Sequence, residues 1–193
     1  MPRSSDAADP RDTRALALGA ALELLHTGGY GSISMENVAR ATGIRKASLY
    51  HHFPGGKDEL MLEVARRMLR EHREGFEAAL TSSVGAHTGL LALARWLLAQ
   101  RGESHRLLRE AARYMPEAHR GEVYQGFMGG LYAPIQAALK RGVASGEFRP
   151  HDTRLSAWMF LSLLSELSAG PEARDPQLAE KLLELFVEGI GPP

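Results

Sequence analysis

The stretch GIRKASLYHHFPGGKDEL, residues Gly43 to Leu60, carries the strongest local signals in the chain. A glycine that can end one helix is followed by a short run typical of a second helix. Pro54 must end that run, because proline lacks an amide hydrogen and cannot continue a helix. Arg45 and Lys46 stand at the front of the run, and Lys57 stands where a further helix is expected to begin.

The composition limits the class of protein. The chain has 193 residues, of which 44% are hydrophobic, so it can bury a core as one domain or as a small domain fused to a larger one. It has no cysteine, which excludes disulfides and thiolate metal sites and fits a reducing compartment. The uncharged, mostly apolar run Leu155–Ser165 is well short of the roughly 20 residues of a membrane-spanning helix. The N-terminus lacks the apolar core of a secretion signal. We therefore expect a cytoplasmic protein without membrane contact, with a flexible arm at residues 1–11.

Apolar residues recur at helical spacing along most of the chain, and no alternating strand pattern appears. The pattern predicts an all-α fold of about nine helices, made of a three-helix unit over residues 12–57 and a larger helical body over residues 58–193. Ser34 is expected to cap the second helix. The expected helices span residues 12–27, 34–41, 45–53, 57–80, 88–100, 104–114, 117–141, 153–169 and 176–190.

The second and third expected helices are joined by a tight turn that contains glycine, which predicts a helix-turn-helix whose second helix can lie in the major groove of DNA. If Leu49 and Phe53, four residues apart, pack inward, the polar side chains between them stay at the surface. Phosphates and base edges accept hydrogen bonds from such side chains. The outward set is Arg45, Lys46, Ser48, Tyr50 and His51.

Charge and helix termini point the same way. Between Asn37 and Lys57 the chain has four basic residues and no acidic one, although its net charge is zero. Free amides at the start of the fourth helix, its dipole and Lys57 are together expected to form a phosphate site. Each feature alone also fits a helical hairpin with a solvated basic face, but their order and spacing favour DNA binding.

The sequence ALELLHTGGYGSISMENVARATGIRKASLYHHFPGGKDEL, residues 21–60, follows nearly end to end the pattern of one family of DNA-binding domains. Residues 12–60 resemble the DNA-binding domain of the TetR family of bacterial transcriptional regulators. The resemblance implies that Lys46, Ser48, Tyr50 and His51 belong to the recognition helix. It also implies contacts of Ser34 and Lys57 with backbone phosphates, and we add Thr42, in the turn, to the expected DNA-binding residues.

Arg45 departs from the family pattern, which has a serine or threonine at the head of the recognition helix. Arginine cannot accept the amide hydrogen bond of a cap, so we expect this cap to be weaker by about 0.5–2 kcal/mol. Arg45 is instead expected to reach a phosphate, or a guanine, with phosphate favoured because phosphate contacts are the majority class. A solvated, unbonded Arg45 is a third alternative.

The adjacent His51 and His52 invite a metal interpretation. Adjacent helical side chains point about 100° apart and do not converge on one ion. We expect His51 to face DNA, His52 to face the domain body, and no metal or other cofactor to be bound.

The last two expected helices offer more apolar surface than a single chain needs. The segment RLSAWMFLSLLSELSAG is apolar nearly all round, and the final helix has two apolar faces. A homodimer that joins these helices into a four-helix bundle would bury them and place two recognition helices about 34 Å apart. The alternative is a monomer that buries both helices in its own core. The resemblance to the TetR family favours the dimer.

Aromatic, methionine and glycine residues in the middle of the body suggest an effector site. Gly126, Gly129 and Gly130 interrupt a helical segment, where each costs around 1 kcal/mol relative to alanine and leaves room. The resemblance implies a mostly apolar ligand cavity with a few polar groups here. Ordinary core packing is the alternative for the aromatic residues. The expected lining is Trp96, Tyr124, Phe127, Met128 and Trp158, with Arg109 or His119 as polar contacts.

The resemblance therefore implies a ligand-responsive regulator, a repressor by the habit of the family. It would bind a pseudo-palindromic operator in double-stranded DNA as a dimer and be released by a small apolar or aromatic effector. We expect no enzyme, because the sequence has no GxSxG, P-loop, GxGxxG or zinc motif. The alternative is an all-helical protein-interaction module or scaffold without DNA binding, which would not need the basic window before Lys57.

Overall fold

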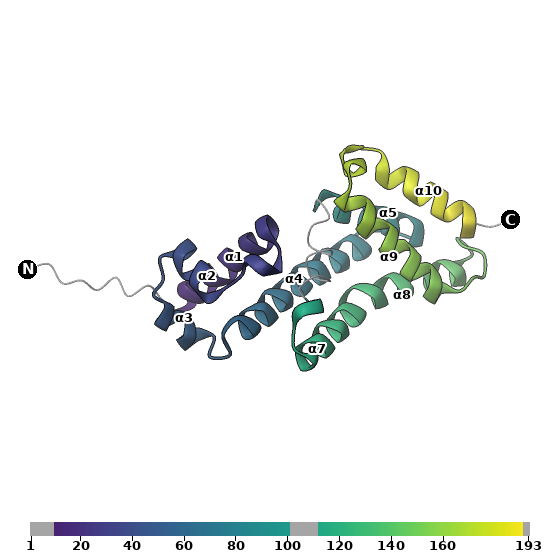
Figure 1. The fold of residues 1–193 in the computed structure, drawn as a ribbon. Coiled ribbons are helices and arrows are strands. Elements are labelled where there is room, and N and C mark those ends of the chain that lie inside the picture. Colours follow the sequence, from purple (N-terminus) through teal and green to yellow (C-terminus); the bar gives the residue numbers. More distant parts are fainter. Residues whose placement is uncertain (1–9, 101–111, 191–193) are drawn as a thin grey trace, which may run out of the picture.

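The computed structural model describes residues 10–100 and 112–190, and within these ranges it contains nine α-helices and three short helical turns. Helices α1, α2 and α3 gather at one end, and the long α4 runs from them into a body formed by the remaining helices (Figure 1). The helices are α1 (Pro10–Gly28), α2 (Met35–Thr42), α3 (Lys46–His52), α4 (Gly56–Thr81), α5 (Ala86–Ala99), α7 (Glu117–Phe127), α8 (Ala133–Ser145), α9 (Thr153–Ala169) and α10 (Leu178–Ile190).

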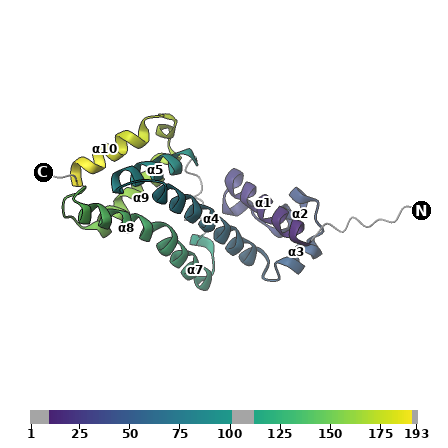
Figure 2. The same ribbon diagram turned by 180° about the vertical axis from the view of Figure 1, so that it is seen from behind.

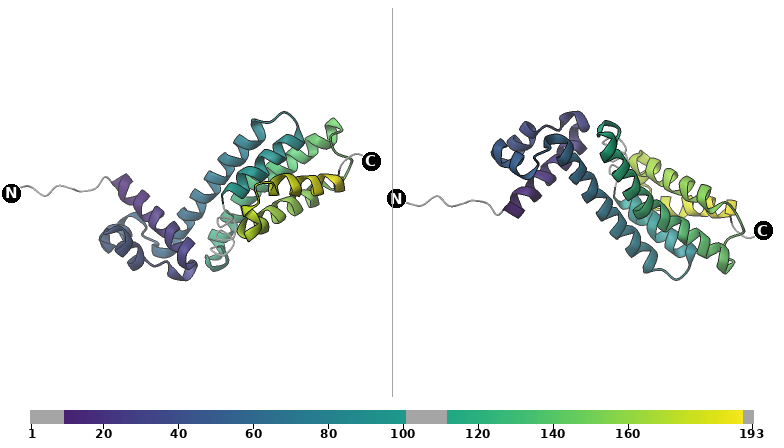
Figure 3. Two further views of the ribbon diagram at one scale, coloured as in Figure 1. Left: turned by 90° about the horizontal axis from the view of Figure 1, so that it is seen from above. Right: turned by 90° about the horizontal axis from the view of Figure 1, so that it is seen from below.

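The view from behind and the two views from above and below agree on how the molecule is laid out (Figures 2 and 3). Helix α10 lies on the outside of the body, at the opposite end of the molecule from α3. It packs on α5 and touches α9 through the rings of Phe160 and Phe186, whose centroids are 5.0 Å apart. In the part of the chain that the structure describes, no helix has both the length and the apolar character needed to cross a membrane.

Local sequence signals set the ends of α2 and α3 as predicted. The Ser34 hydroxyl accepts a hydrogen bond from the amide of Asn37 at 3.0 Å, which is an N-cap. Gly43 ends α2 in the left-handed region, with φ 71°, where a side chain is disfavoured. Leu49 and Phe53 have no exposed surface, so the predicted inward face of α3 is confirmed.

Helix α4 joins the two parts of the molecule. Its 26 residues span about 39 Å. The predicted inner residues Leu60, Val64 and Met68 are buried, and α4 packs against α1 near one end and α5 near the other. Any change of angle between the N-terminal helices and the body must therefore involve α4.

The helix predicted over residues 117–141 is present, but it is not regular throughout. A π-helical turn, η2 (Met128–Tyr132), separates α7 from α8. Just before this turn α7 packs closely on α4: a Cβ atom at Gly126 would lie 2.8 Å from Cδ1 of Leu69. Wider turns of this kind inside a helix are rare and often occur at functional sites.

The other body helices lie close to their predicted positions. Helix α9 matches residues 153–169, and α10 begins at Leu178, two residues later than predicted. The helix predicted over residues 104–114 lies mostly outside the described residues, as do residues 1–9 of the predicted arm.

The packing of α4 on α5 yields a test of the fold. A Cβ atom added at Gly75 would lie 2.0 Å from Cζ2 of Trp96, whose indole makes edge-on contacts with His72 and Phe76. We expect Gly75→Ala to lower the free energy of unfolding by about 1–3 kcal/mol, because the indole must move. Denaturant titration measures this change. At the control position Gly121 a Cβ atom meets nothing within 4 Å, so Gly121→Ala should be neutral or stabilising. Equal losses for both variants would contradict the packing.

Candidate nucleic-acid interface

The outward face of α3 carries the predicted polar set. Arg45, Lys46, Ser48, Tyr50 and His51 are all exposed, while Leu49 on the opposite face is fully buried. The Tyr50 ring leans toward the start of α4, where a Cβ atom on Gly56 would lie 3.4 Å from its Cε1 atom. Gly56 itself has φ 64°, which favours glycine at this position. The geometry therefore provides a polar helix face that is open to a groove.

Arg45 stands at the head of α3 without a capping hydrogen bond from its side chain, as predicted. Its backbone is extended, with φ −62° and ψ 135°, and its carbonyl accepts the amides of Ser48 and Leu49. The guanidinium is exposed. Arg45 thus forgoes a cap and presents a positive charge beside the face of α3.

Ser34 and Thr42 flank α2 and use their hydroxyl groups differently. Ser34 accepts from the amide of Asn37, so its own hydroxyl hydrogen can still be donated to a phosphate. The Thr42 hydroxyl donates to the carbonyl of Val38 at 2.7 Å and accepts from the amide of Ile44 at 3.3 Å. Thr42 is therefore engaged in closing the turn, and Ser34 has more capacity for DNA.

Lys57 lies in the first turn of α4 and packs on Tyr30. Its Nζ donates to the Tyr30 carbonyl at 3.1 Å and lies 3.8 Å from the centroid of the Tyr30 ring. Desolvation lowers the pKa of Lys57, and the charge of Asp58 opposes this only in part. A phosphate contact by Lys57 would have to extend or replace these contacts.

The predicted free amides at the start of α4 are wrong for two residues. The Gly55 amide donates to the Glu59 carboxylate at 2.7 Å, and the Gly56 amide donates to the Phe53 carbonyl at 2.8 Å. The negatively charged Glu59 carboxylate therefore takes up an amide that was expected to bind a phosphate. Sequence reasoning missed it, although a glutamate in the first turn of a helix is a common partner for such amides.

The two adjacent histidines differ in exposure in the expected direction. His51 is exposed and His52 half-buried, with their ring centroids 5.5 Å apart. Residues 10–100 and 112–190 contain no group of three or more histidine, cysteine, aspartate or glutamate side chains that could hold a metal ion.

The predicted effector residues fall into separate environments. Phe127 stacks on Trp158 at 5.8 Å between centroids, and Tyr132 packs on the same indole at 5.0 Å. Trp96 instead contacts His72 and Phe76. Met128 packs on the hydrophobic core, Tyr124 is exposed, His119 is half-buried, and Arg109 lies outside the described residues.

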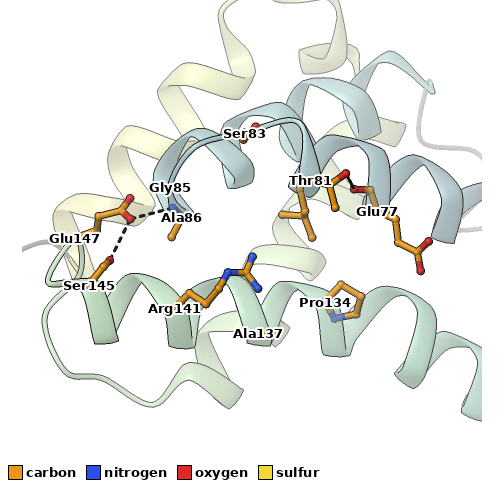
Figure 4. Close-up of a pocket in the computed structure, with 11 residues that line it drawn as sticks. Glu77, Thr81, Ser83, Gly85, Ala86, Pro134, Ala137, Arg141, Ser145 and Glu147 are labelled. Carbon is orange, nitrogen blue, oxygen red and sulfur yellow. Dashed lines mark hydrogen bonds between the residues drawn. The ribbon is translucent and has the colours of Figure 1, made fainter.

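Two surface grooves border α4. The first, of about 590 Å³, lies between α4 and the π turn; the three glycines of the sequence prediction help to line it, together with Arg66, Arg70 and Arg73. The second, of about 570 Å³, lies at the far end of α4 (Figure 4). There Glu147 accepts the amides of Ala86 and His87 at 3.0 Å and so caps α5. That role was hidden in a segment that sequence reasoning treated only as a break.

Helices α9 and α10 form a third, mostly apolar groove of about 620 Å³. Its lining includes Met159, Leu163 and Leu185, and together with Leu155 these side chains are 45–71% exposed. Large apolar side chains gathered at one exposed site mark an interaction surface.

Comparison with known proteins supports a DNA-binding regulator of the helix-turn-helix class. The family model for bacterial regulatory proteins of the tetR family matches residues 17–64. The chain is 27% identical over 185 residues to the HTH-type transcriptional regulator YhgD of Bacillus subtilis (strain 168), covering 91% of this chain and 95% of YhgD. A tetR-family regulatory protein from Rhodococcus RHA1 has the same fold, with a TM-score of 0.81 at 19% identity, over 94% of this chain and 98% of that one.

A further solved structure with this fold contains both a small molecule and operator DNA. AibR in complex with isovaleryl coenzyme A and operator DNA matches with a TM-score of 0.76 at 18% identity, over 94% of this chain and 99% of AibR. Residues 17–64 thus match the DNA-binding domain of tetR-family regulators, and the chain as a whole shares its fold with solved structures of that family.

The uncapped head of α3 yields a test that separates stability from DNA contact. We expect Arg45→Thr to raise the free energy of unfolding by about 0.5–2 kcal/mol, because threonine can accept an amide of the first turn. The same change should weaken binding to DNA, because a positive charge beside the helix face is lost. Denaturant titration and fluorescence anisotropy measure the two effects. A variant that is no more stable, or that binds DNA as well as the original, would contradict this role of Arg45.

Proposed function

We propose that the protein is a ligand-responsive repressor that binds a pseudo-palindromic operator as a homodimer and leaves it when a small effector binds. The observation that carries the proposal is the polar outward face of α3, held in place by the buried Leu49 and Phe53. In this account Lys46, Ser48, Tyr50 and His51 enter the major groove. Arg45, Ser34, Thr42 and Lys57 lie along the DNA backbone, with Lys57 reaching a phosphate from its seat on Tyr30.

The groove between α9 and α10 supports a dimer. A second copy of the chain would cover the exposed apolar side chains Met159, Leu163 and Leu185, and a two-fold axis makes the same patch complementary to itself. The two copies of α3 would then face successive major grooves. A monomer would leave this apolar surface in water.

The effector is proposed to bind beside α7 and the π turn. Phe127, Met128 and Trp158 supply apolar and aromatic surface. The neighbouring groove carries Arg70, which could bind an anionic group, beside Arg66 and Arg73, which pair with Glu122 and Glu77 in the same groove. Trp96, Tyr124, His119 and Arg109 complete the proposed set. Because AibR was solved with isovaleryl coenzyme A, short acyl-coenzyme A esters are the first compounds to test.

The mechanism follows from linkage. An effector can shift the protein only by its differential affinity for the DNA-binding and released forms, typically by 1–3 kcal/mol of coupling. The released form would hold its two recognition helices at a spacing that no longer matches the DNA. The rival function, a helical scaffold, would bind no DNA and would leave the basic face of α3 without a role.

We expect the protein to bind a DNA fragment from upstream of its own gene with an affinity that falls steeply as salt rises. Tyr50→Ala and Lys46→Ala should each weaken binding by about 1–3 kcal/mol, because each removes a contact of the recognition helix. Lys140→Ala, at an exposed lysine of α8, is the matched control and should bind normally. Anisotropy titrations across salt, with and without isovaleryl coenzyme A, measure these effects. A protein that ignores duplex DNA, or whose binding the α3 variants leave unchanged, is not this regulator.

The dimer can be tested without DNA. We expect Leu163→Glu to convert the protein from a dimer to a monomer, because it places a charge in the apolar groove. Light scattering after gel filtration measures the mass. Val84→Glu makes the same change at a side chain that is 97% exposed in the loop between α4 and α5, and it should leave the dimer intact. A monomeric wild-type protein, or a dimer that tolerates Leu163→Glu, would contradict the proposed interface.

A further inference from the structure

An ion-pair chain links three helices at the junction between the N-terminal helices and the body. Its centre is Glu63 on α4, whose side chain is only 13% exposed. One carboxylate oxygen of Glu63 accepts from Nη2 of Arg14 on α1 at 2.7 Å, and the other accepts from Nη1 of Arg66 at 2.5 Å. Burial alone would raise the pKa of Glu63, but the two arginines outweigh it and lower this pKa, so the carboxylate stays ionised.

Arg66 carries the chain onward into the body. Its Nε and Nη2 atoms lie 2.5 and 2.7 Å from the two carboxylate oxygens of Glu122 on α7. This paired geometry fixes the orientation of both groups as well as their distance. Helices α1, α4 and α7 are therefore joined through consecutive charged contacts.

Arg14, at one end of this series of ion pairs, lies close to the end of the recognition helix α3. The guanidinium of Arg14 lies 5.6 Å from the ring centroid of Phe53, the residue that follows α3. Phe53 is fully buried, so a shift of Arg14 acts on a residue that anchors α3.

A second bridge lies on the other side of Pro116. The ring of Tyr114 stacks on Tyr30 with centroids 4.9 Å apart and planes 16° from parallel. Tyr30 in turn holds Lys57 at the start of α4. The short segment from Tyr114 to Glu122 thus contacts Tyr30 before its proline and Arg66 of α4 after it.

Other ion pairs of α4 set a useful contrast. Arg67 pairs with Glu71 and Arg73 pairs with Glu77, both four residues apart on the same helix. These pairs are exposed, as is the pair of Arg66 with Glu122, but they lie within one helix and cannot fix one helix against another. The pair of Arg66 with Glu122 joins residues 56 apart in sequence and two different helices.

We propose that residues 114–122 form a clamp that sets the angle of the DNA-binding helices relative to the body, with Arg14, Glu63, Arg66 and Glu122 as its positioning residues. The proposal rests on the proposed function and names where its regulation acts. Helix α7 continues directly into the π turn beside the proposed effector site, so an effector that displaces α7 pulls Glu122 from Arg66 and frees the N-terminal helices. The clamp holds the form that binds DNA.

The clamp can be tested without DNA, because the chain has no cysteine and accepts labels at chosen sites. Spin labels on Ala41→Cys in α2 and Ala144→Cys in α8, both exposed positions, report the distance between the two parts. Labelled chain is diluted in excess unlabelled chain, so that only distances within one chain are measured by pulsed electron resonance. Glu122→Gln should broaden or shift the distance distribution. Glu71→Gln, which removes an ion pair confined to α4, should not.

Glu122→Gln is a mild change, because Arg66 keeps its contact with Glu63. Its thermal unfolding midpoint should therefore match that of Glu71→Gln, which separates positioning from folding. A Glu122→Gln distribution that superimposes on the wild-type one, or an equal broadening in Glu71→Gln, would overturn the clamp.

Binding to the upstream DNA fragment gives a second readout. Arg14→Gln and Glu122→Gln should each weaken binding about threefold to tenfold. Both substitutions interrupt the same series of ion pairs. The double variant should therefore bind DNA with about the same affinity as whichever single variant binds less tightly. Independent effects would multiply, and that result would overturn the clamp. If the wild-type protein binds no DNA, the proposed function fails, while the distance measurement still decides whether the clamp exists.

Discussion

The burial of Leu49 and Phe53 is the constraint on which the rest of the structure depends. A helix of seven residues does not persist alone in water, because nucleating it costs more than its few hydrogen bonds return. Helix α3 exists because these two side chains lie in the core shared with α1 and α2. The same constraint turns Lys46, Ser48, Tyr50 and His51 outward, so one face of α3 packs in the core and the other is open to the proposed DNA contact.

Local signals made most of the N-terminal domain predictable. The Ser34 cap, the left-handed Gly43 and the stop at Pro54 each act within a few residues, and the sequence shows them directly. The close approach of Gly126 to Leu69, just before the π turn, could not be predicted, because 57 positions separate the two residues. The contact of Lys57 with Tyr30 could not be predicted either, because 27 positions separate the two residues.

The two sides of the body carry different kinds of surface. The side next to the N-terminal helices carries the charged chain through Glu63, the stacked tyrosines and the π turn, so it is suited to transmit a change of shape. The far side carries the apolar groove of α9 and α10, which suits a fixed contact between two copies. The 26-residue α4 runs from the N-terminal helices into this body, so under the proposed mechanism a change at Glu122 would reach α3 through α4.

Hydrogen–deuterium exchange with and without DNA tests the central claim, that the outward face of α3 binds DNA. With the fragment from upstream of the gene, the account predicts slower exchange in α3 and at the start of α2, and little change in the α9–α10 groove. Protection confined to the body, or unchanged exchange in α3 while DNA is bound, would contradict it.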